Sequence, residues 1–138
     1  MGNRFLRVTL IVLDAFLALT AFAGGIGLLT GVAAPPVEQL AGSPFKDYTV
    51  PALALFVLVG GGALVAAIMT IRRHPLAPLA SAAAGGMIIF FEIVEVFAIG
   101  SEPGVARNLQ IFYLGLGLVI LLLALLQWSS QRRNPAAA

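Results

Sequence analysis

Four long apolar stretches dominate the sequence, and each is long enough to cross a membrane as a helix. A spanning helix needs about 20 mostly apolar residues, because the hydrocarbon core of a bilayer is about 30 Å thick. The stretches run from Phe5 to Thr30, from Val50 to Ile71, from Leu76 to Gly100 and from Leu109 to Trp128. Backbone polar groups in lipid must be satisfied within the segment, so we expect four helices. A transmembrane barrel would instead show alternating segments of about ten residues.

The composition supports this interpretation. Apolar residues make up 60% of the 138 residues and charged residues only 10%, whereas about 25% of the residues in soluble domains are charged. The absence of cysteine excludes a disulfide-stabilised domain, and the basic residues form no cluster typical of nucleic-acid binding. The sequence therefore predicts an all-α membrane protein with a single domain, residues 1–138, folded as an antiparallel bundle of four transmembrane helices.

The basic residues predict how the bundle is oriented. If all four stretches cross the membrane, six arginines fall on one side: Arg4, Arg7, Arg72, Arg73, Arg132 and Arg133. Only Lys46 and Arg107 fall on the other side. Because cytoplasmic loops carry the excess of positive charge, we expect a multi-pass protein with both termini in the cytoplasm. The first stretch also has features of a signal peptide, but Asp14 interrupts it, which favours a retained span.

The connection between the first two stretches has the composition of an ordered loop. Residues 31–49 contain Pro35-Pro36, which can begin a short helix, and Gly42-Ser43-Pro44, which can end one. We therefore expect an ordered outer loop that lies on the bundle as a lid. Residues 101–105 predict a turn.

Three acidic residues, Asp14, Glu92 and Glu95, fall inside the predicted spans. A carboxylate near the middle of a bilayer costs about 2.5–3.5 kcal/mol or more, so these side chains should face protein rather than lipid. Spacings of three and four residues support this expectation, because they place polar and small residues on one seam of each helix. The seam of the third stretch contains Ser81, Gly85, Ile88, Glu92, Glu95 and Ile99, and that of the fourth contains Gln110, Tyr113, Gly117, Ile120, Ala124 and Gln127.

These seams predict a polar pocket near the outer face of the bundle, built on Glu92 and Glu95. We expect Tyr113 and Gln110 to donate hydrogen bonds to Glu95, and Arg107 to reach the pocket from the outer interface. Such a pocket suits a cation, a proton or the polar head of a lipophilic molecule. An equally weighted alternative is that the two glutamates only hold the register of the helices, and Tyr113 is more typical of an interface anchor.

Asp14 lies in the opposite half of the predicted bundle, about 10 Å from the inner boundary. Its expected partners are Arg7, two turns below it on the same face, or Arg72 from the inner connection. We include Asp14 among the candidate ligand-binding residues, although a structural role is the more common one for a single buried carboxyl.

Several chemistries lack the residues that they need. A carboxylate-bridged dimetal site requires histidine ligands near its glutamates. The only histidine, His74, lies in the connection between the second and third apolar stretches. Neither a zinc site nor a Ser-His-acid triad can be assembled, so we expect no metal, no cofactor and no enzymatic activity.

Several short motifs resemble those of a group of small, uncharacterised bacterial four-helix membrane proteins. The resemblance rests on Gly42-Ser43-Pro44-Phe45 with Asp47-Tyr48-Thr49-Val50-Pro51, on Arg72-Arg73-His74-Pro75 and on Glu92-Ile93-Val94-Glu95-Val96. In size and helix count the chain is also similar to the DoxX-like membrane proteins. The resemblance implies a bacterial cytoplasmic (inner) membrane and brings no activity, substrate or site residue.

These observations predict a binding or accessory protein of the membrane whose outer pocket takes a lipophilic or cationic small ligand. One alternative is a small transporter or channel for protons or cations that uses Asp14, Glu92 and Glu95. Another is a structural subunit of a larger membrane complex. The expected partners are the lipid bilayer and either further copies of the chain or other membrane proteins, and nucleic acid is not among them.

Overall fold

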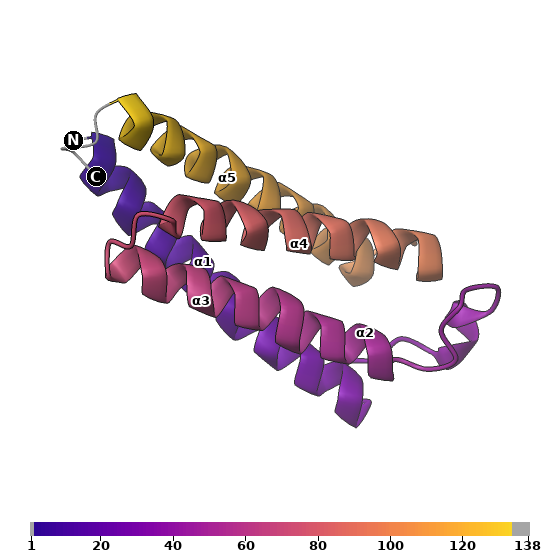
Figure 1. Ribbon diagram of the computed structural model, residues 1–138. Coiled ribbons are helices and arrows are strands. Elements are labelled where there is room, and N and C mark those ends of the chain that lie inside the picture. Colours follow the sequence, from indigo (N-terminus) through magenta and orange to yellow (C-terminus); the bar gives the residue numbers. More distant parts are fainter. Residues whose placement is uncertain (1, 134–138) are drawn as a thin grey trace.

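Helices are the only regular secondary structure in residues 2–133, the part of the chain that the computed structural model describes (Figure 1). Side chains are described from Arg4 onward. The long helices are α1 (Gly2–Thr30), α4 (Ala77–Ile99), α5 (Val105–Arg133) and one helix in three consecutive segments, α2 (Thr49–Leu53), η2 (Ala54–Gly61) and α3 (Gly62–Ile71). A short 3-10 helix, η1 (Val37–Leu40), lies in the connection after α1. We call the continuous helix Thr49–Ile71 the second helix.

All four long helices are long and apolar enough to cross a membrane, which indicates a multi-pass membrane protein. Their bounds follow the predicted stretches closely, with one clear difference. The last helix begins at Val105 and continues to Arg133, several residues beyond the apolar stretch at each end. Helical hydrogen bonding can continue into the polar interface, so a helix need not end where its apolar stretch ends.

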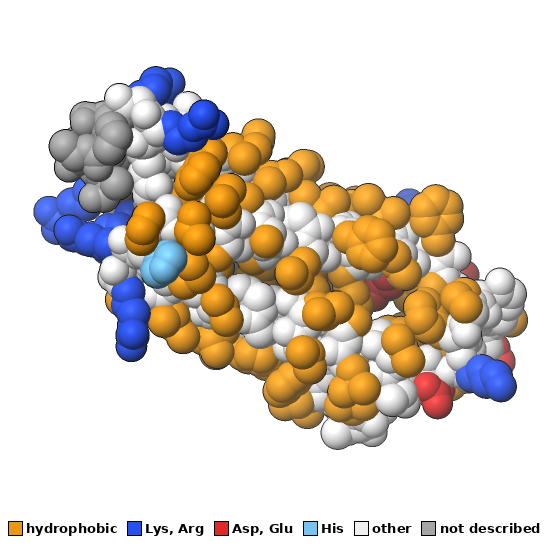
Figure 2. Space-filling model, in the orientation of Figure 1, with side chains coloured by type: hydrophobic (Ala, Val, Ile, Leu, Met, Phe, Trp, Pro, Cys, Tyr) orange, Lys and Arg blue, Asp and Glu red, His pale blue; other side chains and the backbone are white. Residues whose placement is uncertain are grey.

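The ends of the helices segregate the basic residues. Figure 1 shows the start of α1, the α3–α4 connection and the end of α5 at one end of the molecule, and the η1 loop and the α4–α5 connection at the other. The six arginines at positions 4, 7, 72, 73, 132 and 133 therefore lie at the first end, which we call the arginine end. Figure 2 shows blue side chains gathered there.

Small residues bring the helices into close contact. Among the described residues, the contiguous cluster of buried apolar side chains contains six alanines, Ala18, Ala21, Ala63, Ala66, Ala84 and Ala124, together with a few large side chains such as Leu17 and Ile120. Many larger apolar side chains are instead exposed, among them Phe97 (86% exposed) and Phe90 (69%). Small residues inside and large apolar residues outside are the arrangement expected where the surrounding solvent is lipid.

The tightest contact joins α4 to α5. A Cβ atom on Gly85 would lie 2.8 Å from the carbonyl oxygen of Gly117 and 3.0 Å from the backbone nitrogen of Leu121. A Cβ atom on Gly117 would in turn meet Ile88 and Ile89 at 2.7 and 2.8 Å. Only glycine allows the two backbones to approach so closely, and the predicted seams of these two helices therefore do meet.

The sequence predicts a regular helix from Val50 to Ile71, but the segment η2 within it is π-helical. Its wider turns lie against α1, where glycines make room for it. A Cβ atom on Gly25 would lie 2.8 Å from the Cβ atom of Phe56, and one on Gly60 would lie 2.8 Å from the ring of Phe22. π-Helical turns are rare and occur frequently at functional sites, so the surroundings of η2 are of interest.

We expect Gly85→Ala to lower the free energy of unfolding by about 1–3 kcal/mol, because the added methyl group collides with backbone atoms of α5 that cannot move aside. Unfolding in mixed micelles of a mild and a denaturing detergent measures this change. Gly115→Ala is the matched control, because a Cβ atom there meets nothing within 4 Å. Equal stabilities of the two variants would show that the α4–α5 contact is not close-packed.

Candidate functional site

The two glutamates of α4 lie side by side near the C-terminal end of the helix but have different surroundings. Glu92 is only 5% exposed, and its Oε2 atom has no hydrogen-bond partner in the described part of the chain. Glu95, one turn later, is half-buried and interacts with the side chain of Glu92. The side-chain amide of Gln110 on α5 donates a hydrogen bond to Oε2 of Glu95 at 3.2 Å. The predicted contact between Gln110 and Glu95 is therefore present.

Gln110 also ties the end of α4 to α5. The helix ends at Gly100, whose φ of +79° lies in the left-handed region that favours glycine. The carbonyl oxygen of Gly100 accepts a second hydrogen bond from the Gln110 amide nitrogen at 3.1 Å. Because Gln110 is only 2% exposed, this amide is a fixed part of the helix junction and holds the Glu95 carboxyl group in place.

Two other predicted contacts of Glu95 are not formed. The ring of Tyr113 packs edge-on against Phe112, with 5.1 Å between ring centroids, and its hydroxyl makes no hydrogen bond to Glu95 among the described residues. The side chain of Arg107 instead donates to the backbone oxygen of Ser101, with its Nε atom at 2.9 Å, and so closes the α4–α5 turn. Tyr113 and Arg107 were both expected to point toward Glu95. The ring of Tyr113 instead packs against its neighbour Phe112, and the guanidinium of Arg107 binds the nearby turn carbonyl of Ser101.

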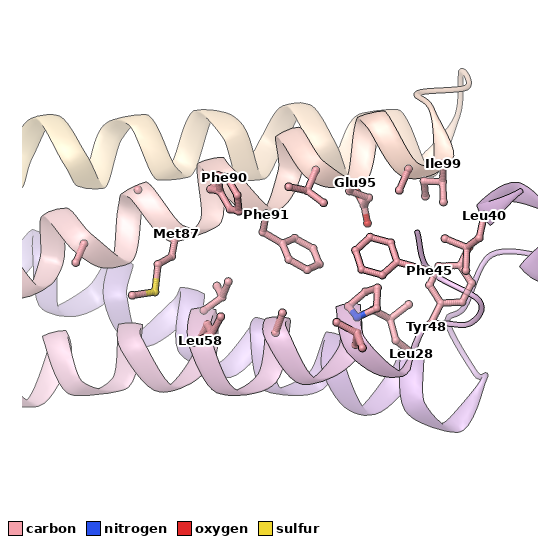
Figure 3. A pocket seen from close by; sticks show the side chains of 18 residues that line it. Leu28, Leu40, Phe45, Tyr48, Leu58, Met87, Phe90, Phe91, Glu95 and Ile99 are labelled. Atoms are coloured by element: carbon pink, nitrogen blue, oxygen red, sulfur yellow. The ribbon is translucent and has the colours of Figure 1, made fainter. Parts of the chain in front are cut away.

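A cavity of about 510 Å³ lies between α4 and the second helix, at the end of the molecule away from the arginine end. Figure 3 shows Glu95 pointing into it. The lining residues are Leu28, Leu40, Phe45, Tyr48, Val50, Pro51, Ala54, Leu58, Val59, Ala83, Gly86, Met87, Phe90, Phe91, Val94, Glu95, Ala98 and Ile99. Glu95 is the only charged residue in this set, and Glu92 is not part of it. The predicted polar pocket is thus a predominantly apolar cavity with one carboxyl group.

The cavity is elongated along the helices. Its lining on α4 runs from Ala83 to Ile99, which corresponds to about 24 Å of helix. The π-helical segment η2 contributes Ala54, Leu58 and Val59 to the opposite wall. The volume lies within the range of about 300–1,000 Å³ that is typical of small-molecule sites. Its length and lining suit a long apolar molecule.

The loop between α1 and α2 closes one end of the cavity. Leu40, which ends η1, is 3% exposed, and Phe45 and Tyr48 line the cavity beside it (Figure 3). The hydroxyl of Tyr48 donates to the carbonyl oxygen of Pro36 at 3.4 Å. Burial, and then the negative charges of Glu95 and Glu38, raise the pKa of the Tyr48 hydroxyl, so it stays protonated and remains a donor. The loop is therefore the ordered lid that its prolines and glycine predict.

The side of the cavity is open between the two helices. Figure 2 shows a hollow in this face, bordered by apolar side chains, with an acidic side chain visible inside. Leu58 from η2 and Phe90 from α4 line the cavity and are 57% and 69% exposed. The cavity therefore communicates with the apolar outer surface of the bundle.

Asp14 forms a separate polar contact in the half of the molecule nearer the arginine end. The hydroxyl of Ser81 on α4 donates to its Oδ2 atom at 2.6 Å, and both residues are fully buried. The predicted partners, Arg7 and Arg72, form no ion pair with it in the described part of the chain. A neighbouring hydroxyl on α4 therefore takes the place of the expected arginine at Oδ2, while the buried Oδ1 atom has no hydrogen-bond partner among the described residues.

In the described part of the chain, no group of three His, Cys, Asp or Glu side chains lies close enough together to hold a metal ion. His74 is exposed in the α3–α4 connection, where its Nδ1 atom accepts a hydrogen bond from the backbone nitrogen of Leu76.

Comparisons with known proteins leave the site without an assigned role: no family model, no curated protein and no solved structure matches the chain. The resemblance to small bacterial four-helix proteins therefore stays a prediction. The function is accordingly inferred from the geometry of the cavity and of Glu95.

The Asp14–Ser81 hydrogen bond should stabilise the bundle. We expect Ser81→Ala to lower the free energy of unfolding by about 1 kcal/mol, the size typical of side-chain hydrogen bonds between membrane helices. Thr20→Ala is the control and should change it less, because the Thr20 hydroxyl bonds only to carbonyls of its own helix. Detergent unfolding of both variants measures the difference. An undiminished effect of Ser81→Ala in an Asp14→Ala background would show that the two side chains are not coupled.

Proposed function

We propose that the chain is a membrane-embedded binding protein whose cavity holds a lipophilic molecule taken from the bilayer. The observation that carries this proposal is an elongated apolar cavity, covered by the lid and open at the side between α4 and the second helix. Apolar molecules dissolved in the membrane meet that opening directly. Molecules in water meet the lid and the charged ends of the bundle first.

The proposal assumes an antiparallel bundle inserted in a membrane. The distribution of arginines supports an orientation in which the arginine end faces the cytoplasm, because positive charge is retained on that side. The lid and the cavity then lie in the outer half of the bilayer. We further propose a bacterial cytoplasmic membrane, on the strength of the sequence resemblance alone.

A lipophilic ligand explains the composition of the site better than an ion path does. Between Ser81 and Glu92 the buried face of α4 consists of Ala84, Gly85 and Ile88, so no polar side chain on this helix connects Asp14 to the glutamates. A proton or cation would need polar or hydrated groups along its route. We therefore favour ligand binding over proton or cation transport as the function. A structural role as a subunit of a larger membrane complex is the second alternative.

Filling the cavity tests the proposal. Gly86 lines the cavity, and a Cβ atom there meets nothing within 4 Å, so Gly86→Leu places a side chain in the cavity without a clash near the backbone. We expect this variant to bind radiolabelled hexadecanol at least about tenfold more weakly than the parent chain. Scintillation proximity with tagged protein in detergent micelles measures the affinity.

Gly115→Leu is the matched control, because this glycine is equally unobstructed but lies on α5 outside the cavity lining. It adds the same side chain to a helix and should leave hexadecanol binding at the parental level. Equal binding by the two variants and the parent, or no saturable binding by the parent, would contradict the proposal.

The orientation is tested separately by labelling, because the chain contains no cysteine. We expect Gln39→Cys in the lid to react with a membrane-impermeant thiol reagent added to intact cells. His74→Cys, which is exposed in the α3–α4 connection, should react only after the cells are permeabilised. The reverse pattern would place the cavity in the inner half of the bilayer.

A further inference from the structure

We infer that the cavity selects lipophilic amines, with the hydrocarbon chain on its apolar walls and the protonated amino group against the Glu95 carboxylate. This inference rests on the proposed function and adds the chemical class of the ligand. It follows from four features of the site: the sign of its charge, the free acceptor capacity of Glu95, the aromatic rings near it and the apolar surroundings.

The charges around the cavity exclude an anionic head group. Glu95 is the only charged side chain in the lining, and no lysine, arginine or histidine contributes to it. The two basic residues at this end do not compensate, because Lys46 is exposed outside the lining and Arg107 is held by the carbonyl oxygen of Ser101. A carboxylate or phosphate head group would therefore lie beside a like charge without a counter-ion.

Glu95 also retains acceptor capacity for a donor on the ligand. An ionised carboxylate accepts up to about four hydrogen bonds, and the described protein occupies only part of this capacity, through Gln110 at Oε2 and through the contact with the Glu92 side chain. The side chain points into the cavity (Figure 3). Gln110 holds the carboxyl group at Oε2, and the cavity that Glu95 lines is the space that a ligand would occupy. A protonated amine has three donors and no acceptor, which complements this arrangement.

Aromatic rings surround the same region of the cavity. Phe45 and Tyr48 from the lid and Phe91 from α4 all contribute to the lining. Figure 3 shows Phe45 and Tyr48 at the end of the cavity that contains Glu95. The negative charge of Glu95 contributes to the raised pKa of the Tyr48 hydroxyl. A cation near the face of an aromatic ring is stabilised by the ring quadrupole, whereas an anion is not.

The apolar walls strengthen the discrimination. Attraction between opposite charges grows as the effective dielectric constant falls, and the remaining lining of this cavity is almost entirely apolar. A neutral alcohol can only donate a hydrogen bond to Glu95, whereas an ammonium group also neutralises its charge. Charge-assisted hydrogen bonds are roughly twice as strong as neutral ones, so we expect an affinity for the amine about tenfold higher than for the alcohol.

The test compares three probes with the same chain: hexadecylamine, hexadecanol and hexadecanoic acid, at pH 7 and in the same micelles. In the parent chain we expect the amine to bind most tightly, the alcohol about tenfold more weakly and the acid most weakly. Partitioning of each probe into micelles is common to all variants, so the amine-to-alcohol affinity ratio of each variant is compared with that of the parent.

Three variants separate the charge of Glu95 from other causes. Glu95→Gln should reduce the amine-to-alcohol ratio about tenfold and leave hexadecanol binding within about twofold of the parental value. Glu95→Asp, which keeps the charge, should keep most of the preference. Glu102→Gln removes a carboxylate from the exposed α4–α5 turn, outside the cavity, and should leave the ratio unchanged.

The outcomes distinguish this inference from the function on which it rests. If the alcohol and the acid bind as tightly as the amine, or if Glu95→Gln and Glu95→Asp change the ratio equally, selection by the Glu95 charge is overturned while lipophile binding stands. If Gly86→Leu and the parent bind all three probes alike, the cavity is not the binding site and both proposals fail. The order of the three probes in the parent chain, corrected for the measured partitioning of each probe into the same micelles, decides the inference even if a Glu95 variant does not fold.

Discussion

The close approach of α4 to α5 is the contact on which the rest of the structure depends. Gly85 and Gly117 let the two backbones meet, and Gln110 joins the same helices again near Gly100. Helix α4 therefore follows α5 along its length. It contacts the second helix closely only toward the α3–α4 connection, and Figure 1 shows the ribbons diverging toward the lid. The divergence leaves the elongated space that forms the cavity.

The same contact explains the different environments of the two glutamates. Glu92 lies on the α4 seam that contains Gly85 and is buried against neighbouring helices. Glu95 is rotated from it by about 60°, since three residues turn an α-helix by roughly 300°, and this rotation brings it to the edge of the cavity. Gln110 then limits the movement of its carboxyl group. One seam thus supplies both a buried acid and an acid that a ligand can reach.

Much of the fold could be predicted from residue types alone, because lipid imposes strong constraints on length and polarity. The four helices follow from the length of the apolar stretches, whereas the seam through Gly85 and Glu92 and the contact from Gln110 to Glu95 follow from three- and four-residue spacings. The partners of Asp14, Tyr113 and Arg107 did not follow, since each depends on which neighbour happens to lie within reach. The long side chains of Arg7 and Arg72 were expected to reach Asp14. In the structure the hydroxyl of Ser81 lies 2.6 Å from the Asp14 Oδ2 atom instead.

The length and the apolar lining of the cavity were not predicted, for a different reason: they depend on where two helices separate, and the residues around the cavity look like ordinary lipid-facing positions. A weak signal existed in α4, where Ala83, Met87, Phe90, Val94 and Ala98 form a second apolar seam beside the polar one. The π-helical wall η2 gave no recognisable signal beyond its glycines. Phe45 and Tyr48 of the lid were expected only as parts of the connection between the first two apolar stretches.

The position of Glu95 has an energetic consequence for any ligand. Asp14 is fully buried and has its hydroxyl partner inside the protein, so its contact contributes to stability whether or not a ligand is present. Glu95 instead faces an apolar cavity, where a carboxylate costs more than in water, and Gln110 offsets only part of that cost. A bound cation would offset the remainder. Because a ligand that binds only the folded state stabilises it by an amount that grows with the ratio of ligand concentration to Kd, the chain should be most stable with the cavity filled. The residue that makes the empty cavity unfavourable is thus the one that would make a protonated amine its preferred occupant.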